Sequence, residues 1–192
     1  MDYLLDLLQG LGIAAGIGIR PFLPTLLVGA LAAENAGVDF GGTDFSFLEQ
    51  AGFLLAIVVL VAVFGFLERR GRIDAVPALV MAGISVVLGA LLAAASIADH
   101  SSTWWPGLIV GAAGALLGFY ATRELLIRTR ARMDAQTAGT LPLYAEGAGV
   151  LSAGLSVLLP PLAIVICGGL VWLLIGGRRR AGEKYAGLRI LK

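Results

Sequence analysis

The stretch that decides how this chain must be built is Gly147–Gly177, GAGVLSAGLSVLLPPLAIVICGGLVWLLIGG. Its 31 residues carry no charge, and as one straight helix they would extend roughly 46 Å, well beyond the ~30 Å of hydrocarbon in a bilayer. Pro160 and Pro161 stand near its middle, where proline removes a helical hydrogen bond and clashes with the preceding turn. We therefore expect two apolar arms joined at the prolines, as two short full spans or as a re-entrant hairpin. The 13-residue arm Gly147–Leu159 favours the hairpin.

The basic residues predict the orientation of this stretch. Thirteen of the fourteen Lys and Arg residues lie in the segments 69–72, 123–132 and 178–192, whereas the other polar segments carry only acids and one His. Loops rich in Lys and Arg stay on the cytoplasmic side of a membrane. The segments before and after residues 147–177 therefore share one side, so this stretch must enter the membrane and return, and the C-terminus is expected in the cytoplasm.

Three other apolar stretches are long enough, or nearly so, to cross a bilayer as full spans: Ala51–Leu67, Ala75–Ala98 and Thr103–Thr122. A further one, Leu7–Ala33, is interrupted by Arg20 and prolines and forms either a hairpin of two 13-residue arms or one kinked span. The expected fold class is all-α, a polytopic transmembrane helical bundle with three full spans and two proline-broken apolar regions.

Composition agrees with this class and excludes several functions. Hydrophobic residues make up 58% of the 192 residues and charged residues 14%, which is typical of an integral membrane protein. We expect one transmembrane domain over residues 1–177 and a basic cytoplasmic tail over 178–192, in a bacterial cytoplasmic (inner) membrane. The net charge of +1 indicates no nucleic-acid partner. Catalytic motifs, metal-ligand clusters and cofactor-binding patterns are not found, so no catalytic residue, metal or cofactor is assigned, and an enzyme is disfavoured.

Arg20 is the most informative residue for function. A charge inside an apolar segment is costly and faces protein or water rather than lipid. The following Pro21 and Pro24 favour a helix start, whose N–H groups and partial positive charge attract anions, and Thr25 adds a hydroxyl. The arginine contributes a two-pronged donor suited to phosphate or carboxylate.

The candidate site has a second half in the last apolar region. Tyr144 and Glu146 precede this region, with Glu146 as a partner of Arg20 or a proton-coupling carboxylate, and Pro160 and Pro161 place another helix start at depth. We hypothesise that the two broken regions approach each other from opposite leaflets and frame a cavity for an anionic lipid or a small anionic ligand, as the interrupted helices of transporters do.

A structural role for Arg20 stands beside this hypothesis. Arg20 would then pair with Glu68, Glu146 or Asp74 and stabilise the bundle, or extend its charged group to an interface. Glu146 itself also suits a helix N-terminus, and a surface position is favoured for His100.

Glycine pairs four residues apart predict close helix packing: Gly12/Gly16, Gly107/Gly111 and Gly114/Gly118. Such glycine-rich faces also fit a homo-oligomer. Two functions thus compete, a transporter or lipid translocase that binds an anion at Arg20, and a non-catalytic scaffold or accessory subunit; a lipid-modifying enzyme is less favoured. A closed Arg20 ion pair together with outward-facing small residues would favour the scaffold.

The motifs Gly-Ile-Arg20-Pro21-Phe-Leu-Pro24 and Tyr144-Ala-Glu146-Gly, with the proline-broken last region and the tail motif Lys184–Arg189, are similar to those of a known family. It is a widespread bacterial family of small multi-pass membrane proteins catalogued as a domain of unknown function. The resemblance covers most of the chain. It implies a membrane location and a multi-pass topology, and it supplies no activity or functional residue.

Overall fold

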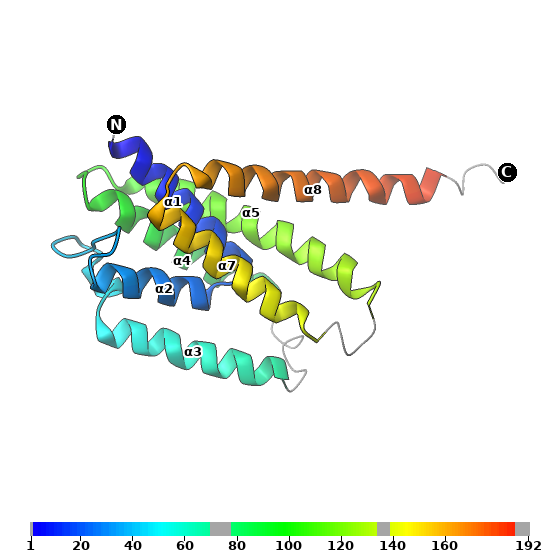
Figure 1. Ribbon diagram of the computed structural model, residues 1–192, viewed down its shortest axis with the longest axis horizontal. Helices are drawn as coiled ribbons and strands as arrows, with labels where there is room; N and C mark the ends of the chain where they lie inside the picture. The colour runs from blue at the N-terminus through cyan, green and yellow to red at the C-terminus, as the bar shows by residue number, and fades with distance from the viewer. Residues whose placement is uncertain (1, 70–77, 134–138, 187–192) are drawn as a thin grey trace.

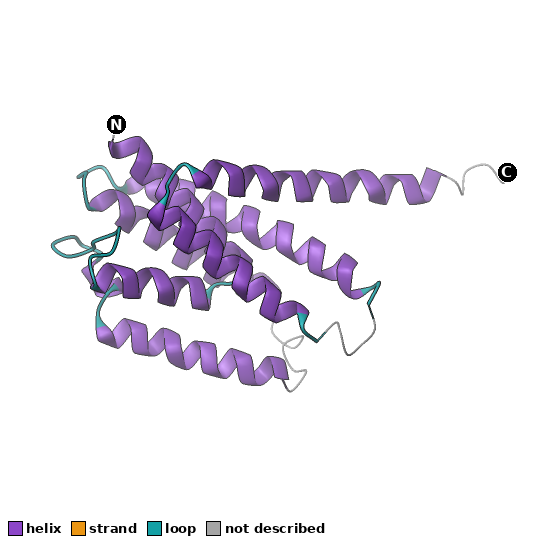
Figure 2. Cartoon of the chain, in the orientation of Figure 1, coloured by secondary structure: helices purple, strands orange, loops and turns teal. Residues whose placement is uncertain are grey.

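The computed structural model describes residues 2–69, 78–133 and 139–186, and these residues form an all-helical bundle (Figures 1 and 2). The helices are α1 (Asp2–Ile19), α2 (Phe22–Ala33), the short 3-10 helix η1 (Ser46–Leu48), α3 (Ala51–Arg69), α4 (Ala78–Ala98), α5 (Trp105–Arg130), α7 (Leu141–Leu158) and α8 (Leu162–Ala186). The predicted all-α class is therefore confirmed.

Successive α-helices run in opposite directions along one axis, so that their ends gather at two ends of the bundle (Figure 1). The basic end contains the arginines at the end of α5, Arg123 to Arg130. The acidic end contains Asp6, Asp99 and the loop between α2 and α3. Within the described residues, three helices, α4, α5 and α7, are long and apolar enough to cross a membrane.

Two of these helices correspond to expected full spans, and the third, α7, corrects an expectation. The predicted arm started at Gly147, but α7 begins at Leu141 and has 18 residues, about 27 Å of helix. Pro142 lies in its first turn, where the missing N–H of proline removes no helical hydrogen bond. The arm is thus longer than predicted, and the argument from its length for a re-entrant hairpin was wrong.

Residues 7–33 form a hairpin rather than one kinked span. The first helix, α1, starts at Asp2 instead of Leu7 and ends at Ile19, and α2 returns in the opposite direction from Phe22 (Figure 1). Pro21 has no N–H to continue the hydrogen-bond ladder of α1, which explains why the helix ends there.

α1 is the central helix, packed against α4, α5, α7 and α8. Its residues Gly12–Gly18 are all buried. An added Cβ at Gly16 would lie 2.7 Å from the carbonyl oxygen of Gly149 in α7, and one at Gly111 in α5 would lie 2.5 Å from the carbonyl oxygen of Gly89 in α4. Glycine is therefore required for these backbones to approach, as the glycine pairs predicted.

The glycine-rich faces that the sequence offered for a homo-oligomer are occupied within this chain. The faces that carry Gly12/Gly16, Gly107/Gly111 and Gly114/Gly118 are covered by neighbouring helices of this chain. These faces therefore form helix–helix contacts inside the bundle. Other glycines have open space beside them, among them Gly168, Gly169 and Gly176 of α8 and Gly52 of α3.

The predicted boundary between the transmembrane domain and the basic tail, after Gly177, does not coincide with the end of a helix. α8 runs without a break through this position to Ala186 and extends beyond the other helices toward the C-terminus (Figure 1). Residues 187–192, the rest of the predicted tail, lie outside the described residues.

Candidate functional site

Arg20 lies in the short turn between α1 and α2, at the basic end of the bundle. Its N–H donates to the carbonyl of Gly16 at 3.2 Å, which completes the last turn of α1. The next residue, Pro21, occupies the N-cap position of α2. Arg20 therefore lies between the C-terminal end of one apolar helix and the N-terminal end of the next.

Glu146 of α7 is an acidic partner of Arg20. The Arg20 Nε and Glu146 Oε1 atoms lie 3.8 Å apart, and the two side chains are 14% and 25% exposed. Of the three acids that the sequence offers as partners, Asp74 and the side chain of Glu68 lie outside the described part of the chain. The contact joins the α1–α2 turn to the second turn of α7 in a partly buried ion pair.

The packing of α1 on α5 shows that Arg20 lies at nearly the same depth in the bundle as Arg123, the first charged residue of α5. The two helices run in the same direction, and an added Cβ at Gly118 would lie 3.0 Å from the Cα of Gly18. Arg20 follows Gly18 by two residues and Arg123 follows Gly118 by five, so the two arginines differ in depth by roughly one helical turn, ~5 Å. Arg20 thus lies near the basic end and not at the middle of the bundle.

Pro24 and Thr25 support the turn from the first turn of α2. Thr25 is fully buried and its Oγ1 donates to the carbonyl of Pro21 at 2.6 Å. An added Cβ at Gly149 would lie 3.1 Å from Pro24 and 3.6 Å from the Cβ of Arg20, so α7 packs directly on this turn. The Thr25 hydroxyl already donates its proton to the carbonyl of Pro21, which favours a positioning role over contact with a ligand.

The other predicted site residues are not brought to Arg20. Tyr144 is 73% exposed on the first turn of α7. Pro160 and Pro161 follow the far end of α7, roughly 20 Å along the helix from Glu146. The expectation that the two proline breaks frame one cavity is therefore not supported, because α7 separates them by nearly its whole length.

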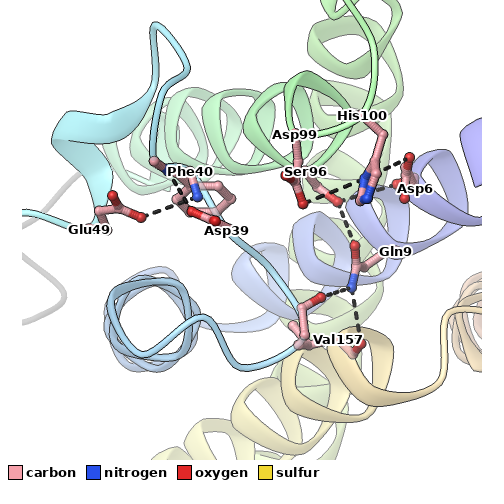
Figure 3. A network of polar contacts seen from close by, with 11 residues as sticks. Asp6, Gln9, Asp39, Phe40, Glu49, Ser96, Asp99, His100 and Val157 are labelled. Atoms are coloured by element: carbon pink, nitrogen blue, oxygen red, sulfur yellow. Dashed lines mark hydrogen bonds and ion pairs between the residues drawn. The ribbon is translucent and has the colours of Figure 1, made fainter.

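A second polar cluster lies at the acidic end, where Asp6 and Gln9 of α1 meet Ser96, Asp99 and His100 from the end of α4 (Figure 3). Gln9 is buried, and its Nε2 donates to the carbonyls of Gly37 at 2.8 Å and Val157 at 3.0 Å. Its Oε1 accepts from Ser96 Oγ at 2.8 Å. One amide therefore connects α1, α4, α7 and the loop after α2.

The prolines of the α7–α8 turn explain one of these bonds. In a continuous helix the carbonyl of Val157 would accept from the N–H of residue 161, but Pro161 has none. Gln9 donates to this carbonyl instead. The broken region is thus completed by a side chain from the centre of the bundle, because an unsatisfied carbonyl away from water is costly.

His100 is 59% exposed but does not lie alone on the surface. Its Nδ1 is 3.5 Å from Asp6 Oδ2 and 3.5 Å from Asp99 Oδ2. The predicted surface location is correct, and the contact with Asp6 of the central helix is additional.

One family model matches residues 7–180, nearly the whole chain. This chain belongs to that family, described as Domain of unknown function (DUF4126). The predicted resemblance to a domain-of-unknown-function family is confirmed. Comparisons with curated proteins and with solved structures found no match.

For this DUF4126 member, sequence reasoning missed Gln9 as a functional candidate. The signal was present, since Gln9 is a polar residue three positions after Asp6, and residues three apart share a helix face. Ser96 lies in the last turn of α4, and His100 lies in the turn that follows this helix. What the sequence did not reveal is that these two faces lie against each other.

Proposed function

We propose that this chain is a membrane transporter or lipid translocase that binds an anionic group at Arg20. The supporting observation is the Arg20–Glu146 pair, a partly exposed arginine at a helix break whose Nε lies 3.8 Å from Oε1 of the acid. An arginine inside an apolar helical hairpin is costly unless it has such a partner, and intramembrane charges commonly mark substrate pathways.

The chemistry of the pair favours exchange of one anion for another. A guanidinium binds phosphate or carboxylate through two parallel, charge-assisted hydrogen bonds, which are short and strong. Glu146 then acts as the internal counter-ion that holds the arginine until a ligand displaces it. The neighbouring N-terminus of α2 adds its partial positive charge on the same side.

The depth of Arg20 supports access from the basic end, which we place on the cytoplasmic side of a bacterial inner membrane from the distribution of Lys and Arg. Lipid phosphates and small soluble anions both reach this level, because charged side chains of α5 begin within about one helical turn of it. The ligand class is therefore a phosphate or carboxylate, from a lipid headgroup or from solution.

The test uses the full chain reconstituted in vesicles, with two assays run in parallel. One follows the flipping of fluorescent phosphatidylglycerol, and the other follows uptake of labelled phosphate into vesicles of neutral lipid. We expect Arg20→Gln to abolish activity and Arg20→Lys to retain part of it. Glu146→Gln should bind the anion more tightly, because the competing carboxylate is gone.

Arg128→Gln serves as the matched control, since Arg128 pairs with Glu124 on the exposed extension of α5 at 3.1 Å. It should leave both assays unchanged. A folded Arg20→Gln variant with wild-type rates in the active assay, or absence of activity in both assays for the wild type, would count against transport.

A scaffold or accessory role is a second candidate, supported by the exposed glycines of α8. A Cβ added at Gly168, Gly169 or Gly176 would meet nothing within 4 Å, and Gly169 and Gly176 are seven residues apart, on one face of the helix. Small residues facing lipid allow close approach of another helix. If a second copy packs there, light scattering in detergent should show a dimer that Gly169→Leu disrupts and Gly52→Leu, at an exposed glycine of α3, does not.

A further inference from the structure

The exposed face of α5 changes from apolar to basic along the helix. Residues three or four apart share one face of a helix. From the acidic end to the basic end, the exposed face of α5 carries Trp105, Leu116, Tyr120, Arg123, Ile127 and Arg130. The opposite face, which includes Gly111 and Gly118, packs against α4 and α1. The described helices therefore leave the outer face of α5 open, and it lies on the opposite side of this helix from α1.

The order of these residues matches the layers of a bilayer. Trp105 and Tyr120 are 15 residues apart, about 22 Å along the helix, and apolar residues such as Leu116 lie between them. Tryptophan and tyrosine concentrate at the two edges of the hydrocarbon, so Arg123, one turn after Tyr120, lies at the depth of the lipid phosphates. α5 has 26 residues, about 39 Å, and the hydrocarbon is ~30 Å thick. The last two turns of α5 therefore continue through the headgroup layer.

These last two turns carry positive charge that no acid of the described residues neutralises. Arg128 is paired with Glu124, whose carboxylate lies 3.1 Å away, whereas Arg123 and Arg130 make no ion pair within the part of the chain that the structure describes. Ile127 lies between these two arginines and is 56% exposed. Side chains on a helix lean toward its N-terminus, so Ile127 leans back toward the hydrocarbon. Unpaired cations around an exposed apolar side chain fit an anionic lipid surface better than water.

We propose that the outer face of α5 binds an anionic phospholipid of the leaflet at the basic end. The lipid phosphate lies against the guanidinium of Arg123 and the hydroxyl of Tyr120, and an acyl chain runs along Leu116. Arg130 is about 10 Å farther along the helix, roughly the distance over which an anionic surface attracts a cation. A second copy in the same orientation does not fit this face, because it would bring the arginines of both copies together. The lipid site does not depend on anion binding at Arg20.

The experiment measures which lipid gathers beside this face. A fluorophore is attached to a cysteine replacing Ala113, an exposed residue of the same face, in a Cys167→Ser background of the full chain in phosphatidylcholine vesicles. Quenching by nitroxide-labelled phosphatidylglycerol is compared with quenching by the same label on phosphatidylcholine. We expect the anionic lipid to quench more strongly. Arg123→Gln should reduce this enrichment about fivefold, the factor equivalent to about 1 kcal/mol for one arginine near an anionic surface.

Two further variants identify the groups responsible. Arg130→Gln should reduce the enrichment by a smaller factor, because it lies farther from the phosphates. The double variant Glu124→Gln with Arg128→Gln is the control, since it removes an ion pair from the same two turns without changing the net charge, and it should keep the enrichment. Equal quenching by the two lipids in the wild type, or enrichment that survives in Arg123→Gln with Arg130→Gln, would overturn the proposal. Absence of quenching by either lipid would do the same, because it would show that protein covers this face.

Discussion

Gln9 donates a hydrogen bond to the carbonyl of Val157 at 3.0 Å, across 148 residues of sequence. The acceptor is available because Pro161 cannot supply the helical N–H that this carbonyl would otherwise bind. A polar residue in the central helix therefore compensates for a proline break in a distant helix. This contact holds α1 against α7 together with the close approach of Gly16 to Gly149.

Replacing Gln9 with leucine should lower the free energy of unfolding by about 1–3 kcal/mol, because the carbonyls of Val157 and Gly37 lose a donor in a buried place. Reversible unfolding in SDS measures this loss. The same substitution at Gln50, which is exposed at the start of α3, should have little effect. Equal losses at the two glutamines would show that the hydrogen bonds of Gln9 are not responsible.

Gly111→Ala should destabilise the bundle by about 1–3 kcal/mol, because the added methyl group would lie 2.5 Å from the backbone oxygen of Gly89. Gly168→Ala, on the exposed face of α8, should be neutral or slightly stabilising, since alanine favours the helix. Thermal unfolding in detergent compares the two. A neutral Gly111→Ala would mean that α4 and α5 can move apart without cost.

Thr25→Val should cost about 1 kcal/mol, because valine keeps the shape of threonine but cannot donate to the carbonyl of Pro21. Thr129→Val is its control, since Thr129 makes the corresponding bond to Leu125 on the exposed end of α5. We expect Thr25→Val also to weaken anion binding at Arg20 in the vesicle assays. Wild-type stability of this variant would argue against a supporting role for Thr25.

The two ends of the bundle should lie on opposite sides of the membrane. Cysteines introduced at Tyr3 and Ser102, at the acidic end, should react with an impermeant maleimide added outside intact cells in the Cys167→Ser background. A cysteine at Arg130, at the basic end, should react only after permeabilisation, because loops rich in Lys and Arg are expected on the cytoplasmic side of a membrane. Labelling of the cysteine at position 130 from outside would show that the orientation is the reverse of the predicted one. Labelling of all three cysteines from one side would contradict a bundle that spans the membrane.

Much of the fold follows from local patterns in the sequence. Long uncharged stretches predicted α4 and α5, prolines predicted both helix breaks, and glycines four residues apart predicted the close contacts of α1 with its neighbours. These features depend on length, backbone chemistry and side-chain size, which act within a helix and its nearest neighbour. The position at which α7 begins was less accessible, because Glu146 suggested that the apolar region began only after it.

The candidate site, like the fold, could be predicted from the sequence only in part. The residue order alone shows that Arg20 is the one basic residue within an apolar region, and it predicts an anionic partner because a charge in such a place is costly. The packing of the helices was needed to show that Glu146 is such a partner and that Pro160 and Pro161 lie at the other end of α7. It also brings Gln9 to Ser96 and His100 to Asp6. These outcomes depend on which helix faces pack together, and that arrangement is set by contacts between residues far apart in the chain.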